Sequence, residues 1–110
     1  MSVPKLSTCL VLEEPQNVPD GAGGLIETWV ELGEIWAALD FGTGTERADQ
    51  LRAIAAVSVT VTVRSALPSS PRRPTANQRF RLGDRIFRIL AVAEDAPGYL
   101  RCFAREEVVT

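Results

Sequence analysis

The chain has 110 residues, of which 45% are hydrophobic and 24% charged, with a formal net charge of −2. These are ordinary values for a single globular domain over residues 1–110, which at this size buries about two-thirds of its unfolded surface, and they indicate neither disorder nor a membrane protein. No apolar run is long enough to cross a bilayer and the start, MSVPKLST, lacks a hydrophobic signal core, so we expect a protein of the cytoplasm.

The first two segments are expected to be a strand and a loop. Residues 8–14, TCLVLEE, predict a short strand because they are apolar and rich in strand-forming residues. The following segment, PQNVPDGAGG at 15–24, contains two prolines and three glycines. We therefore expect the strand to end there, in a flexible connector or a contact loop.

Residues 23–40, GGLIETWVELGEIWAALD, carry both tryptophans and are expected to form the centre of the fold. Their apolar residues fit a helical stripe or two alternating β segments, but the parity of the apolar set changes at Gly33, as at a β-bulge. We favour two β segments joined at Gly33, with four side chains in the core: Ile26, Val30, Ile35 and Leu39. Trp29 and Trp36 lie on the more polar face, so they contact a partner or are covered within the subunit.

Residues 41–64 predict a helix followed by a strand. In FGTGTERADQLRAIAA, two glycines end the preceding strand, and Thr45 is placed to cap a helix of about two to three turns. A strand with one buried face is then predicted by valines that alternate with polar residues: Val57, Val59, Val61 and Val63.

Residues 65–78, SALPSSPRRPTANQ, contain three prolines and no apolar periodicity. We expect a long extended loop with Arg72 and Arg73 at its centre. Three roles are open for it: a contact with DNA phosphates, an arm laid on a neighbouring subunit, or a solvated loop.

The last third predicts a β meander of RFRL (79–82), RIFRILAVAE (85–94) and YLRCFAREE (99–107), with turns at 83–84 and 97–98. The middle strand is apolar on both faces, so we expect it to be central and buried on both sides. Arginines on these strands are suited to bind nucleic acid, to pair with acidic residues or to line a channel: Arg79, Arg81, Arg85, Arg88, Arg101 and Arg105.

Charge and chemistry point away from catalysis. Residues 1–50 hold nine acidic residues against two basic ones, whereas residues 51–110 hold ten arginines and five acids. The halves either meet unlike partners or intermix in the fold, where their charges cancel locally.

The residues that catalysis commonly needs are missing or badly placed. The chain has no histidine, and Cys9 and Cys102 form no metal or redox motif. Adjacent carboxylates such as Glu13 and Glu14 point to opposite faces of a strand. We therefore expect no enzyme and no cofactor or metal site.

Several features follow one another in an order that is informative as a whole: DGAGG (20–24), Trp29, Trp36 and Ala37, ERA (46–48), a Val-x-Val-Arg strand ending at Arg64, and RFRLGDRIFRILAVAE (79–94). This order resembles that of the small head-tail joining proteins of tailed bacteriophages, also called head completion or stopper proteins. PRRPTANQRF (71–80) and CFAREEV (102–108) are similar to the version in alphaproteobacterial gene transfer agents, phage-like particles that package host DNA.

The resemblance implies a mainly β fold, a small antiparallel β-barrel with one short helix and long loops. It implies assembly in the bacterial cytoplasm into the neck of a virion or gene transfer agent particle, as a ring of roughly six or twelve copies. The implied partners are copies of itself, the portal/adaptor protein on the head side and a tail terminator or tail tube protein on the tail side. Contact with packaged double-stranded DNA is left open, and no membrane is implied. The ring would join head to tail and help gate the DNA channel with a loop, for which the candidates are Phe41–Ala53 and Ser65–Gln78.

The interface candidates are Trp29, Trp36, Glu27, Glu31, Arg72 and Arg73, and the channel- or DNA-facing candidates are Thr43, Thr45, Arg47, Arg72 and Arg73. The rival hypothesis is a free-standing OB-like barrel that binds single-stranded nucleic acid through its arginines. Its candidate stacking platforms are limited to Phe80, Phe87, Tyr99 and Phe103, of which Phe87 is expected to be buried. A pI of ≈ 5.1 is also unsuited to such a protein.

Overall fold

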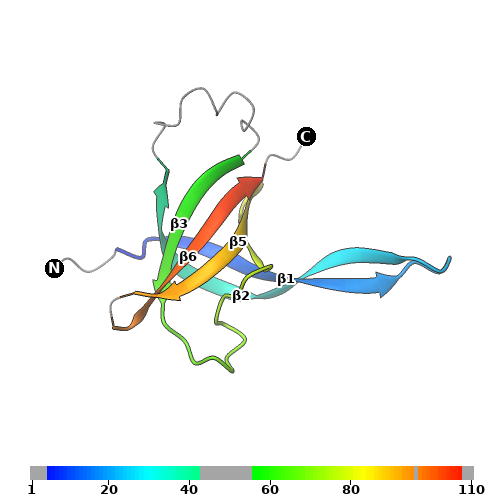
Figure 1. The fold of residues 1–110 in the computed structure, drawn as a ribbon, viewed down its shortest axis with the longest axis horizontal. Coiled ribbons are helices and arrows are strands. Elements are labelled where there is room, and N and C mark those ends of the chain that lie inside the picture. Colours follow the sequence, from blue (N-terminus) through cyan, green and yellow to red (C-terminus); the bar gives the residue numbers. More distant parts are fainter. Residues whose placement is uncertain (1–4, 43–55, 96, 108–110) are drawn as a thin grey trace.

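The computed structural model describes residues 5–42, 56–95 and 97–107. Within these ranges the chain forms six strands: β1 (Thr8–Pro19), β2 (Leu25–Phe41), β3 (Ala56–Arg64), β4 (Arg79–Leu82), β5 (Arg85–Glu94) and β6 (Tyr99–Glu107). They pair antiparallel in the order β1-β2-β3-β6-β5-β4, and β4 closes the barrel against β1. Strands β3, β6 and β5 lie side by side in the barrel (Figure 1). The expected mainly β barrel is confirmed, whereas the helix expected after Thr45 lies outside the described residues.

The barrel interior is filled by alternate side chains from all six of these strands. Val59, Val61 and Val63 are buried, as their alternation predicts, while the side chain of Val57 lies outside the described part. Each large apolar side chain buried here contributes about 1.5–3 kcal/mol to folding. The bulkiest of them are Phe80, Phe87, Leu10, Leu12, Ile89 and Leu100.

Strand β1 continues to Pro19, so the prediction that it ends before Pro15 is wrong. It pairs with β2 over its whole length, but with β4 only from Val11 to Glu13. Beyond Glu13 one edge of β1 has no strand beside it among the described residues. Proline lacks an N–H and is tolerated in a strand whose edge is open, which explains how both prolines are accommodated.

A β-bulge lies where the sequence predicts a change of parity. Leu12 pairs with Gly33 and Glu13 with Glu31, so Leu32 is the extra residue on β2. Gly33 has a φ of +142°, a conformation that other residues rarely adopt. The parity change at Gly33 is confirmed, and β2 runs through it as one continuous strand.

The core assignment for β2 is right on one side of the bulge and wrong on the other. Ile35 and Leu39 pack against the core, but Ile26 and Val30 are 50% and 40% exposed. Ile26 and Val30 keep the parity of Leu32, which does pack on the core. At their position, however, the strand has run past the barrel (Figure 1). Periodicity identifies the apolar face of a strand but not the length over which a barrel covers that face.

The C-terminal meander is confirmed, including its strands and both turns. The prediction that β5 is buried on both sides throughout is wrong. Ile86 and Phe87 are buried on opposite faces, but a second bulge at Leu90 changes the parity and leaves that side chain 55% exposed. Beyond it, Val92 packs against the core.

The loop at 65–78 lies against the barrel. Pro74 is fully buried and Gln78 is 7% exposed. The Gln78 side-chain oxygen accepts a hydrogen bond from the Thr75 N–H at 2.9 Å, and Arg73 Nη1 donates to the Ala66 carbonyl at 2.8 Å. These contacts argue against a freely solvated loop.

The strain at the bulge can be measured. Gly33→Ala should lower the free energy of unfolding by about 1–3 kcal/mol, because alanine is strained at positive φ. Urea denaturation measures the difference. The control is Glu34→Ala, next on the same strand, whose side chain is exposed and which should cost less than about 0.5 kcal/mol. Equal stability of the two variants would contradict the bulge.

Candidate assembly interface

A two-stranded arm projects from the barrel (Figure 1). We define the arm as residues 14–30, which comprise parts of β1 and β2 and the turn between them. β1 pairs with β4 only up to Glu13 and β2 pairs with β3 only from Ala37, so within the described residues neither edge of the arm has a further strand partner. Three large apolar side chains are exposed on it: Leu25 (69%), Ile26 (50%) and Val30 (40%).

The turn at the end of the arm is organised by Asp20. Its Oδ1 accepts hydrogen bonds from the N–H groups of Ala22 at 2.7 Å and Gly24 at 3.0 Å. The Asp20 N–H also donates to the Gly24 carbonyl at 3.1 Å. The main-chain hydrogen bonds lower the pKa of Asp20, which is therefore charged at neutral pH. The arm thus ends in a defined, negatively charged turn.

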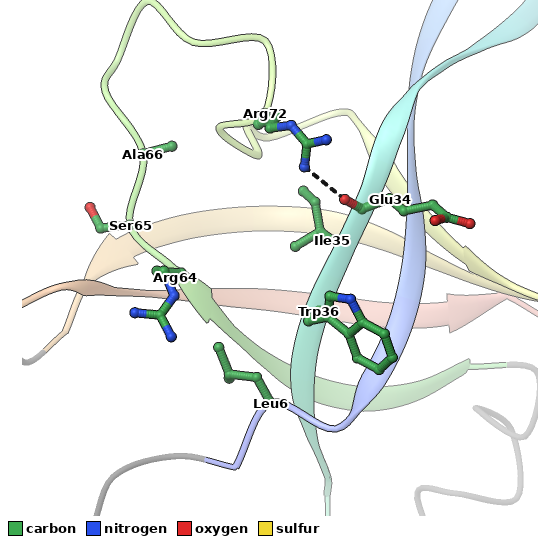
Figure 2. Close-up of a pocket in the computed structure, with 8 residues that line it drawn as sticks. All are labelled: Leu6, Glu34, Ile35, Trp36, Arg64, Ser65, Ala66 and Arg72. Atoms are coloured by element: carbon green, nitrogen blue, oxygen red, sulfur yellow. Dashed lines mark hydrogen bonds between the residues drawn. The ribbon is translucent and has the colours of Figure 1, made fainter.

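A groove of ≈ 490 Å³ lies further along β2, beyond the bulge (Figure 2). Trp36 is 57% exposed and provides a large apolar surface there. Such an exposed aromatic side chain in a groove is typical of an interaction site. We define the groove by the residues that line it: Leu6, Glu34, Ile35, Trp36, Arg64, Ser65, Ala66 and Arg72.

Two arginines make the rim of the groove positive. Arg72 Nη1 donates a hydrogen bond to the main-chain carbonyl of Glu34 at 2.9 Å, while the Glu34 carboxylate points away (Figure 2). The guanidinium carbon of Arg64 lies 6.0 Å from the centre of the Tyr99 ring. In the part of the chain that the structure describes, neither arginine forms an ion pair. Both charges are free to attract an acidic partner.

Trp29 is half-buried under two arginines. The guanidinium carbon of Arg79 lies 4.0 Å from the centre of an indole ring, and that of Arg88 lies 5.6 Å away. Such cation–π contacts stabilise by about 0.5–2 kcal/mol. The covering groups for this tryptophan are therefore side chains of the same subunit, whereas Trp36 remains exposed.

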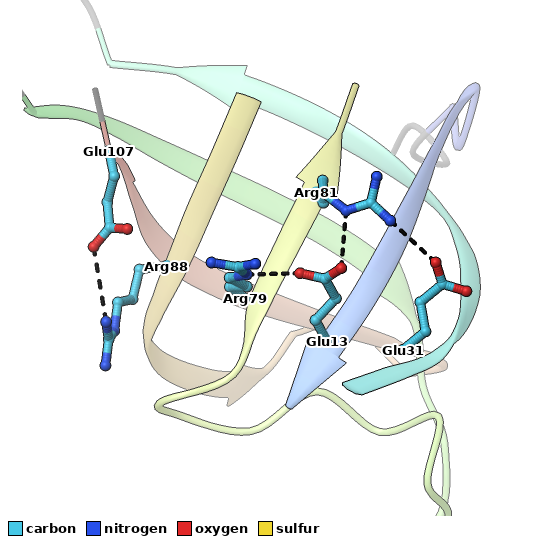
Figure 3. Close-up of polar contacts among 6 residues, drawn as sticks. All are labelled: Glu13, Glu31, Arg79, Arg81, Arg88 and Glu107. Carbon is cyan, nitrogen blue, oxygen red and sulfur yellow. Dashed lines mark hydrogen bonds and ion pairs between the residues drawn. The ribbon is translucent and has the colours of Figure 1, made fainter. Parts of the chain in front are cut away.

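Glu13 connects the acidic first half of the chain to the basic second half (Figure 3). Its two oxygens accept hydrogen bonds from Arg79 Nε at 2.6 Å and Arg81 Nε at 2.8 Å, and Arg81 Nη2 donates to Glu31 at 3.0 Å. Burial alone would raise the pKa of Glu13, but the hydrogen bonds and charges of the two arginines hold it below its ordinary value of 4.5. Ionised Glu13 therefore holds β1, β2 and β4 together, and the two halves intermix at this point.

Three other arginines also have carboxylate partners. Arg85 binds both oxygens of Glu106, at 2.7 Å and 2.9 Å, and the hydrogen bonds from Arg85 lower the pKa of Glu106. The remaining two pairs are Arg88 with Glu107 at 3.8 Å, shown in Figure 3, and Arg101 with Asp95 at 2.8 Å. These arginines are largely neutralised within the subunit.

The aromatic side chains give little support to a stacking surface. Phe80 and Phe87 are completely buried in the barrel. The prediction that Phe80 offers a stacking platform is wrong, because its side chain points into the core. Phe103 is 41% exposed and Tyr99 is partly buried. The arginine-bearing strands therefore lack the row of exposed rings that a single-stranded nucleic acid needs.

The sequence-derived candidates separate into three groups. Trp36 and Arg72 meet in the groove, and Glu27 is exposed on the arm. Three candidates are engaged within the subunit: Trp29, Glu31 and Arg73. The others lie outside the described residues: Thr43, Thr45 and Arg47.

Of the eight residues that line the groove, sequence reasoning proposed Trp36 and Arg72 as contacts and missed the others, among them Leu6 and Arg64. Leu6 precedes the first predicted strand and belongs to no periodic pattern. Arg64 is visible in the sequence only as the end of the valine strand. The groove forms because three distant segments of the chain meet, and no local pattern records such a meeting.

Within the described ranges, no three histidine, cysteine, aspartate or glutamate side chains are grouped as metal ligands. Burial raises the pKa of the Cys102 thiol to about 12, so this cysteine is protonated. The described residues contain no helix long and apolar enough to cross a membrane.

Comparison with known proteins gives a consistent result. The sequence profile of the phage head completion protein family matches residues 1–107. A chain of the virion of a native gene transfer agent particle is 51% identical, with a TM-score of 0.78 over 98% of this chain and 100% of that one. A protein of Shigella flexneri 2a, solved in solution, shares the fold at 19% identity, with a TM-score of 0.68 over 96% of each chain. No curated protein sequence matches the chain.

The buried carboxylate predicts a pH dependence. Because the folded-state pKa of Glu13 is lowered, its stabilising effect is complete above about pH 4.5 and is lost as the pH falls through the folded-state pKa. Glu13→Gln should cost about 2 kcal/mol at pH 7 and should reduce the loss of stability on acidification.

Denaturant unfolding of the wild-type chain and of Glu13→Gln between pH 3 and pH 7 measures the free energy of unfolding and its change with pH. Glu27→Gln, on the exposed arm, is the matched control and should change the free energy of unfolding by less than about 0.5 kcal/mol. If Glu13→Gln behaved like this control, the network in Figure 3 would contribute nothing to stability.

Proposed function

Because the chain belongs to the phage head completion protein family, we propose that it is a structural protein of the neck of a tailed phage or gene transfer agent particle. In this proposal, copies of the chain form a ring that joins the portal/adaptor complex of the head to the tail. The ring also helps gate the channel through which DNA passes.

The observation that carries this proposal is the identity of 51% to a gene transfer agent virion component over 98% of this chain and 100% of that one. It supports a place in the particle for this chain, assembled in the bacterial cytoplasm and then held between head and tail proteins.

The surface of the barrel supports a role in assembly. Four of the eight large apolar side chains exposed in the described residues lie on the arm or at Trp36 in the groove, and clustered exposed apolar groups commonly mark interaction sites. The portal/adaptor protein, a tail terminator or tail tube protein and further copies of the chain are the partners that this surface is proposed to serve.

Gating is assigned to a loop, for which residues 41–53 and 65–78 remain the candidates. Arg72 and Arg73 already donate hydrogen bonds to main-chain carbonyls, which holds their charges in place on the second of these loops. Contact of either segment with packaged DNA remains a prediction, as it does for Thr43, Thr45 and Arg47, which lie outside the described residues.

The free-standing nucleic-acid-binding barrel is the less favoured function. Five arginines of the sheet are paired with carboxylates, and two of the four aromatic rings proposed for stacking are buried. A binder of single strands depends on free cations and accessible rings.

Removing the gene from the producing bacterium tests the role directly. We expect filled heads without attached tails, counted by electron microscopy, and restoration of joined particles by the wild-type gene. A tagged copy should appear at the neck of intact particles. Normal joined particles in the deletion strain would rule out the neck function.

Trp36→Ala separates assembly from folding. Since Trp36 is 57% exposed, its removal should change the free energy of unfolding by less than about 1 kcal/mol. If it is an interface residue, the number of joined particles should fall about tenfold or more. The control is Phe103→Ala, which removes an exposed ring from β6, outside the groove, and should leave particle numbers unchanged. A Trp36→Ala chain that unfolds, or that assembles normally, would contradict the interface assignment.

A further inference from the structure

The arm and the groove have complementary surfaces. The arm carries the exposed side chains Ile26 and Val30 on one face, and in residues 14–30 it has three acidic residues and no basic one. The groove offers the exposed Trp36, and Arg64 and Arg72 also line it (Figure 2). An apolar strip with negative charges matches an apolar groove with a positive rim.

The two surfaces cannot meet within one subunit. Leu25 and Trp36 belong to the same continuous strand, β2. At a rise of about 3.3 Å per residue, that strand separates them by about 35 Å. An arm can therefore reach only the groove of a different molecule.

One carboxylate of the arm is best placed for a partner. Asp20 is occupied by the main-chain N–H groups of its own turn, and Glu27 follows Ile26 on β2, so its side chain points to the opposite face. Glu14 pairs with Val30 across the arm, so its side chain lies on the face of Ile26 and Val30. It is exposed, accepts a hydrogen bond from Gln78 at 3.4 Å and has no ion-pair partner among the described residues. In the groove, Arg72 is held by the Glu34 carbonyl, which leaves Arg64 as the freer cation.

We propose that the arm of each copy docks in the groove of the next copy, with Ile26 and Val30 covering Trp36 and Glu14 paired with Arg64. The contact joins two different surfaces, so it repeats from copy to copy and closes when the rotation completes a ring. A self-complementary contact would instead stop at a dimer. This inference rests on the proposed function, because the ring in the particle is what brings neighbouring copies together.

Cysteine cross-linking in purified particles tests the contact. The variant with Ile26→Cys and Ser65→Cys places one thiol on the arm and one at the groove. After mild oxidation we expect a ladder of disulfide-linked copies on a denaturing gel, at least about tenfold stronger than in the control that combines Ile26→Cys with Asp84→Cys at a distant turn. The wild-type chain, with Cys9 and Cys102, gives the background.

A charge exchange tests the pairing. Glu14→Arg in the cross-linking variant should weaken the ladder about tenfold, and adding Arg64→Glu should restore it. A double variant that stays as weak as Glu14→Arg would overturn the pair.

The remaining outcomes distinguish this inference from the function on which it rests. A chain present in the particles that gives no ladder, or that cross-links to a different particle protein, would overturn the arm-to-groove contact and leave the structural role intact. A chain absent from the particles would overturn both.

Discussion

The β-bulge between β1 and β2 is the constraint on which the other features depend. It adds one residue to β2 at Leu32 and uses the positive φ of Gly33 to change which face of the strand is apolar. On one side of it β2 lines the barrel and presents Trp36 to the groove. On the other side the strand leaves the barrel and forms the arm. The single strand β2 thus carries residues of both proposed contact surfaces. Because the strand is extended, the distance between the two surfaces is set by the number of residues between them.

Electrostatics within the subunit decides which charges are free. Glu13 and Glu31 neutralise Arg79 and Arg81, and pairs within the last two strands neutralise Arg85 and Arg88. These contacts are partly shielded from solvent and hold neighbouring strands in register. After this pairing, negative charge remains on the arm and positive charge at the groove. Among the described residues, Glu13 and Glu31 are the carboxylates of the acidic first half that pair with arginines of the basic second half, so much of the division between the halves remains at the surface.

The open edge of β1 in the arm is protected against pairing with strands of other chains. Open strand edges invite pairing with other chains, and the open edge of β1 carries Pro15 and Pro19, which cannot donate the hydrogen bonds that such pairing needs. Its contacts are then determined by side chains rather than by main-chain pairing at that edge. This is consistent with the proposed docking of the arm through its side chains.

The sequence by itself determined where most of the strands lie and, for much of their length, which face of each strand is apolar. The alternating valines of β3, the turn at 83–84, the limits of β4 and β6 and the change of parity at Gly33 are all local patterns, and local patterns reflect the periodicity of a strand directly. Only the tertiary structure decided where the barrel ends along β2, so that Ile26 and Val30 are exposed although their parity is that of core residues. It also decided that Phe80 points inward, that arginines cover Trp29, and that Leu6, Arg64 and Arg72 meet at Trp36. These outcomes depend on segments far apart in the chain, and the spacing of residues within one strand contains no information about which distant segment will lie beside it.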